Sequence, residues 1–106
     1  VQGLADVFAM LKMDWEGPEA AELNQLIFEH MYYAAVSTSA DIATVEGVYS
    51  TFRGSPISKG HLQPDLWNVV PLSEKDESLD WPALRVKAAG GIRNSLLIAP
   101  MPTAST

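Results

Sequence analysis

The sequence predicts a mainly helical chain: a short helix, a long central helix, an extended wrapping loop, a third helix and one short strand. Three observations lead to this fold class. Apolar residues recur every three or four positions near the start of the chain. The run from residue 18 to residue 45 contains no helix breaker. Proline and glycine then punctuate the middle of the chain. A length of 106 residues fits a single segment, 1–106, that is one domain or a piece of one.

The first helix is expected over residues 3–11. Its apolar residues have the spacing that places them on one face of a helix. They are Leu4, Val7, Phe8 and Leu11. Residues 14–17 interrupt this pattern, so the helix should be short.

The central helix is expected from Pro18 to Val45. Proline is tolerated in a first helical turn, where a missing N–H costs nothing, and Gly47 is a suitable stop. Such a helix would be roughly 42 Å long at 1.5 Å per residue. A compact chain of this length has a diameter of about 33 Å, so the helix is longer than the body it should belong to.

The central helix is apolar nearly all round. One stripe consists of Leu23, Leu26, Ile27, His30, Met31, Ala34 and Val45. Phe28, Tyr32 and Val36 lie on the opposite side, and Glu22, Gln25 and Glu29 form a narrow polar strip. A helix of this kind is buried in a larger body or by oligomerisation. Alternatively, residues 47–70 fold back over it and shield Phe28, Tyr32 and Val36, and the sequence leaves both packings open.

The remaining elements are shorter. Residues 47–74 are expected to form the wrapping loop, which we call the wrapping segment. A third helix is expected from Leu79 to Ala89, with Asp80 as its N-cap and two glycines at its end. The apolar stretch from Asn94 to Ala99 is expected to form the short strand, although no partner strand is evident.

Composition excludes several functional classes. The chain has 7 basic residues, 13 acidic residues and no cysteine, and its formal net charge is −6. An acidic chain is unsuited to non-specific nucleic-acid binding. Without cysteine it can form no disulfide scaffold, thiolate metal site or cysteine nucleophile. No apolar run is long enough for a membrane span. We therefore expect a cytoplasmic protein with no nucleic-acid or membrane partner.

Neither histidine is expected to hold a metal ion. His30 lies on the apolar stripe, where a core histidine bonded to a carboxylate or a backbone carbonyl is expected. His61 lies in the wrapping segment, without a second histidine or a carboxylate at metal-ligand spacing. Tyr32, Tyr33 and Tyr49 are expected to be packing residues.

The last residues carry the most informative pattern. The apolar stretch 94–99 runs into a turn rich in proline and small hydroxyl residues. In α/β enzymes a strand gives way at such a point to a helix whose N-terminal N–H groups bind phosphate. The candidate phosphate-binding residues, which we call the phosphate loop, are Pro102, Thr103, Ala104, Ser105 and Thr106. From spacing alone, a frayed chain end is the commoner explanation.

Four stretches carry a resemblance to a known family. They are VQGLADVF at 1–8, LNQLIFEHMYYAA at 23–35, GSPISKGHLQPDLWNV at 54–69 and GIRNSLLIAPMPTAST at 91–106. They resemble the large (catalytic) subunit of class I ribonucleotide reductase. The resemblance implies that 1–106 is a piece of the ten-stranded α/β barrel of that family, which reduces ribonucleoside diphosphates to deoxyribonucleotides for DNA synthesis. It also implies that the phosphate loop begins a barrel helix and binds the phosphates of the ribonucleoside diphosphate.

The same resemblance implies that the chemistry is supplied outside this sequence. The family uses a thiyl-radical cysteine, two redox cysteines, a radical-bearing small subunit and nucleotide effectors, whereas this chain has no cysteine. The chain should therefore contain no catalytic residue and no cofactor of its own, and the isolated chain should have no reductase activity. Because it begins at Val1 rather than at methionine, we expect an internal segment of a longer reductase.

A second hypothesis is a stand-alone helical module that associates with itself or binds phosphate without catalysis. Both hypotheses predict a homo-oligomer of this chain. The reason is that the central helix exposes apolar residues that the rest of a barrel would cover, and exposed apolar patches drive association.

Overall fold

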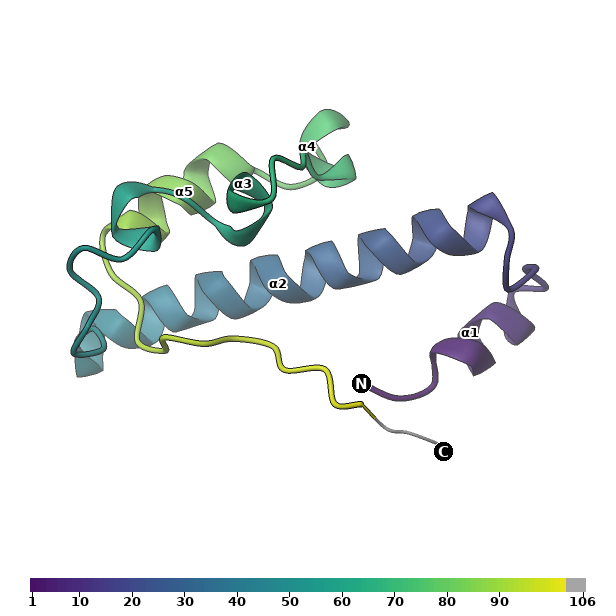
Figure 1. The fold of residues 1–106 in the computed structure, drawn as a ribbon, viewed down its shortest axis with the longest axis horizontal. Helices are drawn as coiled ribbons and strands as arrows, with labels where there is room; N and C mark the ends of the chain where they lie inside the picture. Colours follow the sequence, from purple (N-terminus) through teal and green to yellow (C-terminus); the bar gives the residue numbers. More distant parts are fainter. Residues whose placement is uncertain (103–106) are drawn as a thin grey trace.

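The computed structural model describes residues 1–102, with α2 (Pro18–Glu46) as the spine of the molecule. The principal extents are 44 × 32 × 23 Å. A helix of 29 residues is about 43 Å long, so α2 alone accounts for the longest dimension (Figure 1). The radius of gyration of 15.7 Å exceeds the ~13 Å of a compact chain of this length. The prediction that the central helix outgrows a compact body is confirmed.

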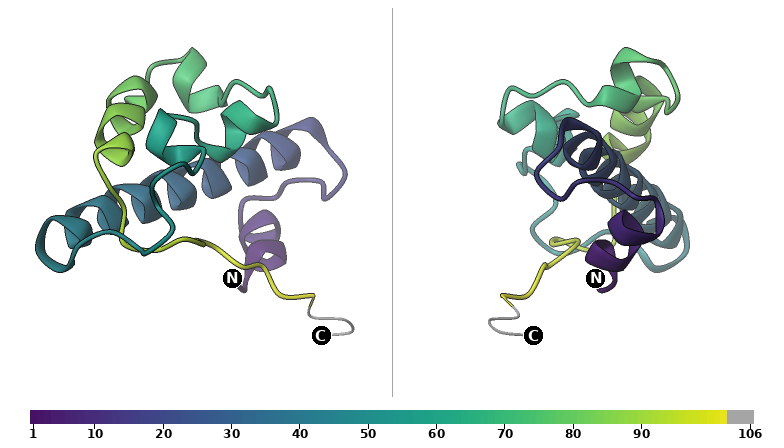
Figure 2. Two further views of the ribbon diagram at one scale, coloured as in Figure 1. Left: turned by 60° about the vertical axis from the view of Figure 1, so that its left-hand side comes forward. Right: turned by 90° about the vertical axis from the view of Figure 1, so that its right-hand side faces the viewer.

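The ends of the first two helices follow from their flanking residues. α1 (Leu4–Met10) is the short helix that the apolar spacing predicted, and it lies beside the N-terminal end of α2 (Figure 2). α2 begins at Pro18 and ends at Glu46, and the next residue, Gly47, donates its backbone N–H to the carbonyl oxygen of Ala43 at 2.9 Å. Gly47 has a φ of 84°, a conformation that favours glycine, and so it terminates the helix.

The wrapping segment is more regular than predicted. It contains η1 (Ile57–Lys59), α3 (Gln63–Leu66) and α4 (Leu72–Lys75). The interpretation of residues 47–74 as continuous loop is therefore wrong in part. Local chemistry explains α3, since Pro64 occupies its first turn and the Asp65 carboxylate accepts the backbone N–H of Leu62 at 2.9 Å. Helices of three or four residues are too short to display an apolar period.

α5 (Trp81–Ala89) is the last helix among the described residues, and it packs against α2. The predicted cap is confirmed, because the carboxylate of Asp80 accepts the backbone N–H of Ala83 at 3.0 Å. The helix begins at Trp81 rather than at the expected Leu79. The difference arises because the N-cap residue itself lies outside the helix.

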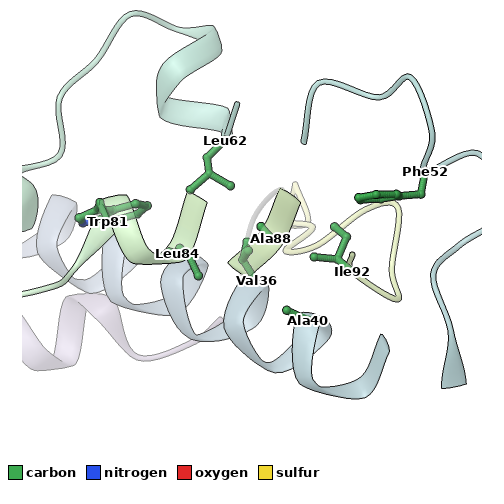
Figure 3. Close-up of a cluster of buried hydrophobic side chains, with 8 residues drawn as sticks. All are labelled: Val36, Ala40, Phe52, Leu62, Trp81, Leu84, Ala88 and Ile92. Carbon is green, nitrogen blue, oxygen red and sulfur yellow. The ribbon is translucent and has the colours of Figure 1, made fainter. Parts of the chain in front are cut away.

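The buried core joins α2, α5, the wrapping segment and the residues that follow α5. It consists of Val36, Ala40, Phe52, Leu62, Trp81, Leu84, Ala88 and Ile92 (Figure 3). Trp81 is fully buried. Its ring stacks on Tyr32 at a centroid distance of 6.3 Å and meets Tyr33 edge-on at 5.4 Å. Tyr49 also packs against the core, so all three tyrosines are packing residues, as predicted.

The buried face of α2 is not the predicted apolar stripe. Val36 and Ala40 are buried, whereas the stripe is half-buried or exposed and Val45 is 87% exposed. The wrapping segment selects the face, since it brings Phe52 and Leu62 into the cluster that contains Val36. The fold-back packing that the sequence left open is thus confirmed at Val36, whereas Phe28 and Tyr32 are only half-buried.

The expectation of a core histidine on α2 is wrong. His30 is exposed, and its ring nitrogen Nδ1 lies 2.8 Å from the carbonyl oxygen of Leu26 in the same helix. The predicted carbonyl partner is present, but it is local. The histidine stays outside the core because the wrapping segment covers the other face of the helix.

The predicted strand from Asn94 to Ala99 is wrong, and the structure contains no strand within residues 1–102. A strand needs a partner for its N–H and C=O groups. Ile98 also has a φ of 62°, which interrupts an extended run. The composition of residues 94–99 suits a strand, but the described chain offers no second strand to pair with it.

Across residues 1–102, no helix is both long and apolar enough to cross a membrane.

Candidate functional site

The candidate phosphate loop lies at the end of the sequence, and only its first residue is described. Pro102 is exposed. Thr103, Ala104, Ser105 and Thr106 lie outside the described residues, so their role stays a prediction. The structure does describe the stretch from Gly91 to Pro102 that leads into the loop, which we call the lead-in segment, and the residues that hold it.

Ser39 of α2 holds the beginning of the lead-in segment. Its hydroxyl donates to Oδ1 of Asn94 at 2.8 Å and accepts the backbone N–H groups of Arg93 and Asn94 at 3.1 and 3.0 Å. The Ser39 carbonyl oxygen accepts the Arg93 N–H as well, at 3.1 Å. Ser39 is 2% exposed, and one donated and two accepted bonds use the full capacity of a hydroxyl.

The turn after α2 holds the same segment from the other side. The backbone N–H of Tyr49 donates to the carbonyl oxygen of Ile92 at 3.3 Å. Gly91 has a φ of 139°, and a Cβ atom at this position would lie only 2.5 Å from Cγ1 of Val48. Glycine is therefore required where the lead-in segment crosses this turn.

Arg93 is directed to the C-terminal end of α2. Its guanidinium donates to the carbonyl oxygens of Glu46 and Gly47 at 3.4 and 3.5 Å, and it lies 4.0 Å from the Glu46 carboxylate. A cation at this end of a helix interacts favourably with the helix dipole. Arg93 thus adds a further, solvent-exposed attachment between α2 and the lead-in segment.

A largely apolar groove of about 790 Å³ runs between α2, the connection of α3 to α4, and the later part of the lead-in segment. Its lining includes Phe28, Tyr32, Trp67, Leu97 and Pro100. Figure 1 shows the chain after α5 passing along α2 towards its N-terminal end. Leu97 also packs against the buried core, so this groove borders the path that leads to the phosphate loop.

Glu29 ties α2 to the start of α4. Its carboxylate accepts the backbone N–H groups of Leu72 and Ser73, both at 2.9 Å, and the Ser73 hydroxyl at 2.6 Å. The Ser73 hydroxyl accepts the indole N–H of Trp81 at 2.8 Å. Burial raises the pKa of Glu29, but the hydrogen bonds from Ser73 and Leu72 outweigh burial and hold the pKa below its ordinary value. The sequence predicted Glu29 only as part of a polar strip on α2. Its role was missed because no local pattern reveals a partner 44 residues away.

Arg85 joins α3, α4 and α5. Its guanidinium donates to both carboxylate oxygens of Asp65, at 2.9 and 3.0 Å, and to Glu74 at 2.7 Å. Hydrogen bonding from Arg85 lowers the pKa of Asp65, and hydrogen bonding to Asp65 and Glu74 raises the pKa of Arg85. The network holds the wrapping segment and α5 together, and it is a structural attachment rather than a reactive centre.

The described part of the chain offers no metal site, since its histidine and carboxylate side chains form no group of three that could hold an ion. Tyr32 has a raised pKa because it is desolvated by burial, and its hydroxyl oxygen accepts the backbone N–H of Gln63 at 3.0 Å. Its geometry is that of a packing residue with a satisfied hydroxyl.

Comparison with known proteins identifies the family. The family model described as "Ribonucleotide reductase, barrel domain" matches residues 1–106. The chain is 53% identical over 107 residues to the ribonucleoside-diphosphate reductase large subunits of Arabidopsis thaliana and Caenorhabditis elegans. It is 50% identical over 107 residues to that of Danio rerio. Each alignment covers 100% of this chain and 13% of the relative.

These matches confirm the resemblance that the four sequence stretches carry, and they favour the reductase hypothesis over a stand-alone module. They also extend through the phosphate loop, because the family match reaches residue 106. The chain spans 13% of the length of the curated relatives it matches. The chain belongs to the ribonucleotide reductase barrel-domain family.

Proposed function

We propose that this chain supplies the substrate-phosphate loop of a ribonucleoside-diphosphate reductase large subunit. The whole protein would reduce ribonucleoside diphosphates to deoxyribonucleotides for DNA synthesis, in the cytoplasm. One observation carries the proposal: the family match covers all 106 residues, loop included, and relatives that are 50–53% identical are named as reductase large subunits. The ordered attachment of the lead-in segment to α2 supports it, because a binding loop needs a fixed base.

The loop residues have distinct roles in this proposal. Thr103, Ser105 and Thr106 offer hydroxyl donors to the phosphate oxygens. Pro102 has a fixed φ that suits the start of a helix, and Ala104 leaves room for phosphate to approach the backbone. Free N–H groups and the dipole at a helix N-terminus stabilise the negative charge of a diphosphate.

The redox chemistry lies outside this chain in the same proposal. The chain has no cysteine, so it cannot supply a thiyl radical or a redox dithiol. A radical-bearing small subunit and nucleotide effectors would act on other parts of the protein. The isolated chain is therefore expected to yield no deoxynucleotide from CDP or ADP in a thioredoxin-dependent assay, and measurable product from the pure chain would overturn this assignment.

A graft tests the loop within a complete enzyme. Residues 1–106 replace the aligned segment of the Arabidopsis thaliana large subunit, which is 53% identical over the same stretch. The triple variant Thr103→Val, Ser105→Ala, Thr106→Val in this graft is expected to raise KM for CDP by about tenfold, because hydrogen bonds to a charged group are lost. Thr38→Val and Ser50→Ala, at exposed positions outside the loop, serve as controls with unchanged KM. An unchanged KM in the triple variant would refute the proposed role of the loop.

The proposal extends to self-association of the isolated chain. Large apolar side chains such as Met10, Trp15 and Val45 are 82%, 62% and 87% exposed, and a chain with such surfaces tends to associate. Light scattering over a range of concentrations should give a mass above that of one chain. A strictly monomeric mass at high concentration would refute self-association.

A further inference from the structure

We propose that Ser39 is a positioning residue for the phosphate loop, acting through its hydrogen bonds to Arg93 and Asn94. This inference rests on the proposed function of the loop. The Ser39 hydroxyl and carbonyl oxygen together make four hydrogen bonds to those two residues. All four lie at the base of the lead-in segment, so Ser39, together with the Tyr49 and Arg93 contacts, sets the direction in which this segment runs along α2.

The rest of the lead-in segment lies along the groove through apolar side chains such as Leu97 and Pro100. No backbone–backbone hydrogen bond joins residues 95–102 to another described residue, and Leu97 packs against the buried core. Pro102 lies eight positions after Asn94, a distance of up to about 26 Å in extended chain. Without such backbone bonds, this stretch depends on its attachment at the base for the path it takes towards the loop. Loss of the Ser39 bonds should therefore displace the loop from the phosphates.

A purely structural role for Ser39 makes a different prediction, and Ser73 provides the comparison. Ser73 is 0% exposed and Ser39 is 2% exposed. The Ser73 hydroxyl also makes two hydrogen bonds, since it donates to Glu29 and accepts from Trp81. None of these partners belongs to the lead-in segment. A general loss of stability should follow from either substitution, but weakened substrate binding should follow only from a change at Ser39.

The test uses the graft of residues 1–106 in the complete reductase. Ser39→Ala is expected to raise KM for CDP by about tenfold with kcat within about twofold, because a displaced loop weakens phosphate binding and leaves the redox centre untouched. Ser73→Ala, the matched control, is expected to lower the melting temperature to a similar extent while KM stays within about twofold. If Ser39→Ala raises KM no more than Ser73→Ala does, the positioning role is refuted.

A second variant keeps the test open if Ser39→Ala does not fold. Asn94→Ala removes the acceptor of the Ser39 hydroxyl from an exposed side chain, and it is expected to raise KM by about threefold. An unchanged KM in this folded variant would also refute the inference. The triple loop variant distinguishes failure of the positioning role from failure of the proposed loop function. If KM rises in the triple variant but not in Ser39→Ala and Asn94→Ala, only the positioning role of Ser39 is refuted. If KM is unchanged in the triple variant, the proposed function of the loop and the positioning role are both refuted.

Discussion

The hydroxyl of Ser73 donates a 2.6 Å hydrogen bond to the carboxylate of Glu29, which lies 44 residues earlier in the chain. This contact attaches the wrapping segment to α2, and the indole N–H of Trp81 reaches the same hydroxyl from α5. Three helices therefore meet at one buried serine. By attaching the end of the wrapping segment to α2, the contact holds that segment over one face of the long apolar helix.

Replacing the Glu29 carboxylate should weaken the whole fold. Glu29→Gln is expected to lower the free energy of unfolding by about 1–2 kcal/mol, because four hydrogen bonds to a charged acceptor, from Gln25, Leu72 and Ser73, become weaker or are lost. Urea denaturation followed by helical circular dichroism measures the change. Glu22→Gln, at an exposed position of the same helix, is the control and should stay within about 0.5 kcal/mol. Equal losses in the two variants would contradict the role of Glu29.

Acid should destabilise the protein through the same carboxylates. The pKa values of Glu29 and Asp65 are lowered in the folded protein, from ordinary values of 4.5 and 3.8. Below those values the unfolded chain binds more protons than the folded chain, so stability falls as the pH falls. It should be constant above about pH 5.5 and decrease from there downwards. Urea midpoints across this range in the wild type and in Glu29→Gln test the slope, which should be shallower in the variant. Identical slopes would count against Glu29 as a source of the pH dependence.

The tryptophans should differ sharply in their contribution to stability. Trp81 is fully buried, whereas Trp67 is 68% exposed. Trp81→Phe is expected to cost about 1–3 kcal/mol, because it leaves a gap in the core and removes the indole N–H from Ser73. Trp67→Phe should change stability by less than about 0.5 kcal/mol. Both are measured by urea denaturation, and a comparable cost at the two positions would mean that the core is assigned wrongly.

The Arg85 network depends on the shape of the guanidinium group. Arg85→Lys is expected to cost about 1–2 kcal/mol even though the charge is kept, because an ammonium group cannot donate to both Asp65 oxygens and to Glu74 in the same planar arrangement. Arg53→Lys, at an exposed position, is the matched control. Thermal unfolding of the two variants measures the difference in stability. An Arg85→Lys variant as stable as the wild type would show that charge alone holds the network.

Sequence reasoning predicted the helices that carry their own local signals. Pro18 and Gly47 delimit α2, and Asp80 caps α5, through chemistry that involves only neighbouring residues. The buried face of α2 was not predictable in the same way. Phe28 and Val36 and the opposite stripe are about equally apolar, and only the fold-back of the wrapping segment decides between them.

The candidate functional site likewise combines a feature with a local sequence signal and one that depends on distant contacts. The phosphate loop is visible as a motif because its residues are consecutive in the sequence. Ser39 is not, because a serine within a helix carries no signal until Asn94 is placed beside it. The failed strand at 94–99 has the same cause, since strand formation depends on a partner that local composition cannot supply.

The most direct test of the central claim is the amount of dCDP formed from CDP by the graft of residues 1–106 in the Arabidopsis thaliana large subunit. The graft is assayed with its small subunit and effectors, beside the unmodified subunit. If this chain supplies a working part of the reductase barrel, the graft should retain activity within about tenfold of the unmodified enzyme. A graft that is folded by circular dichroism and forms no dCDP would contradict the claim.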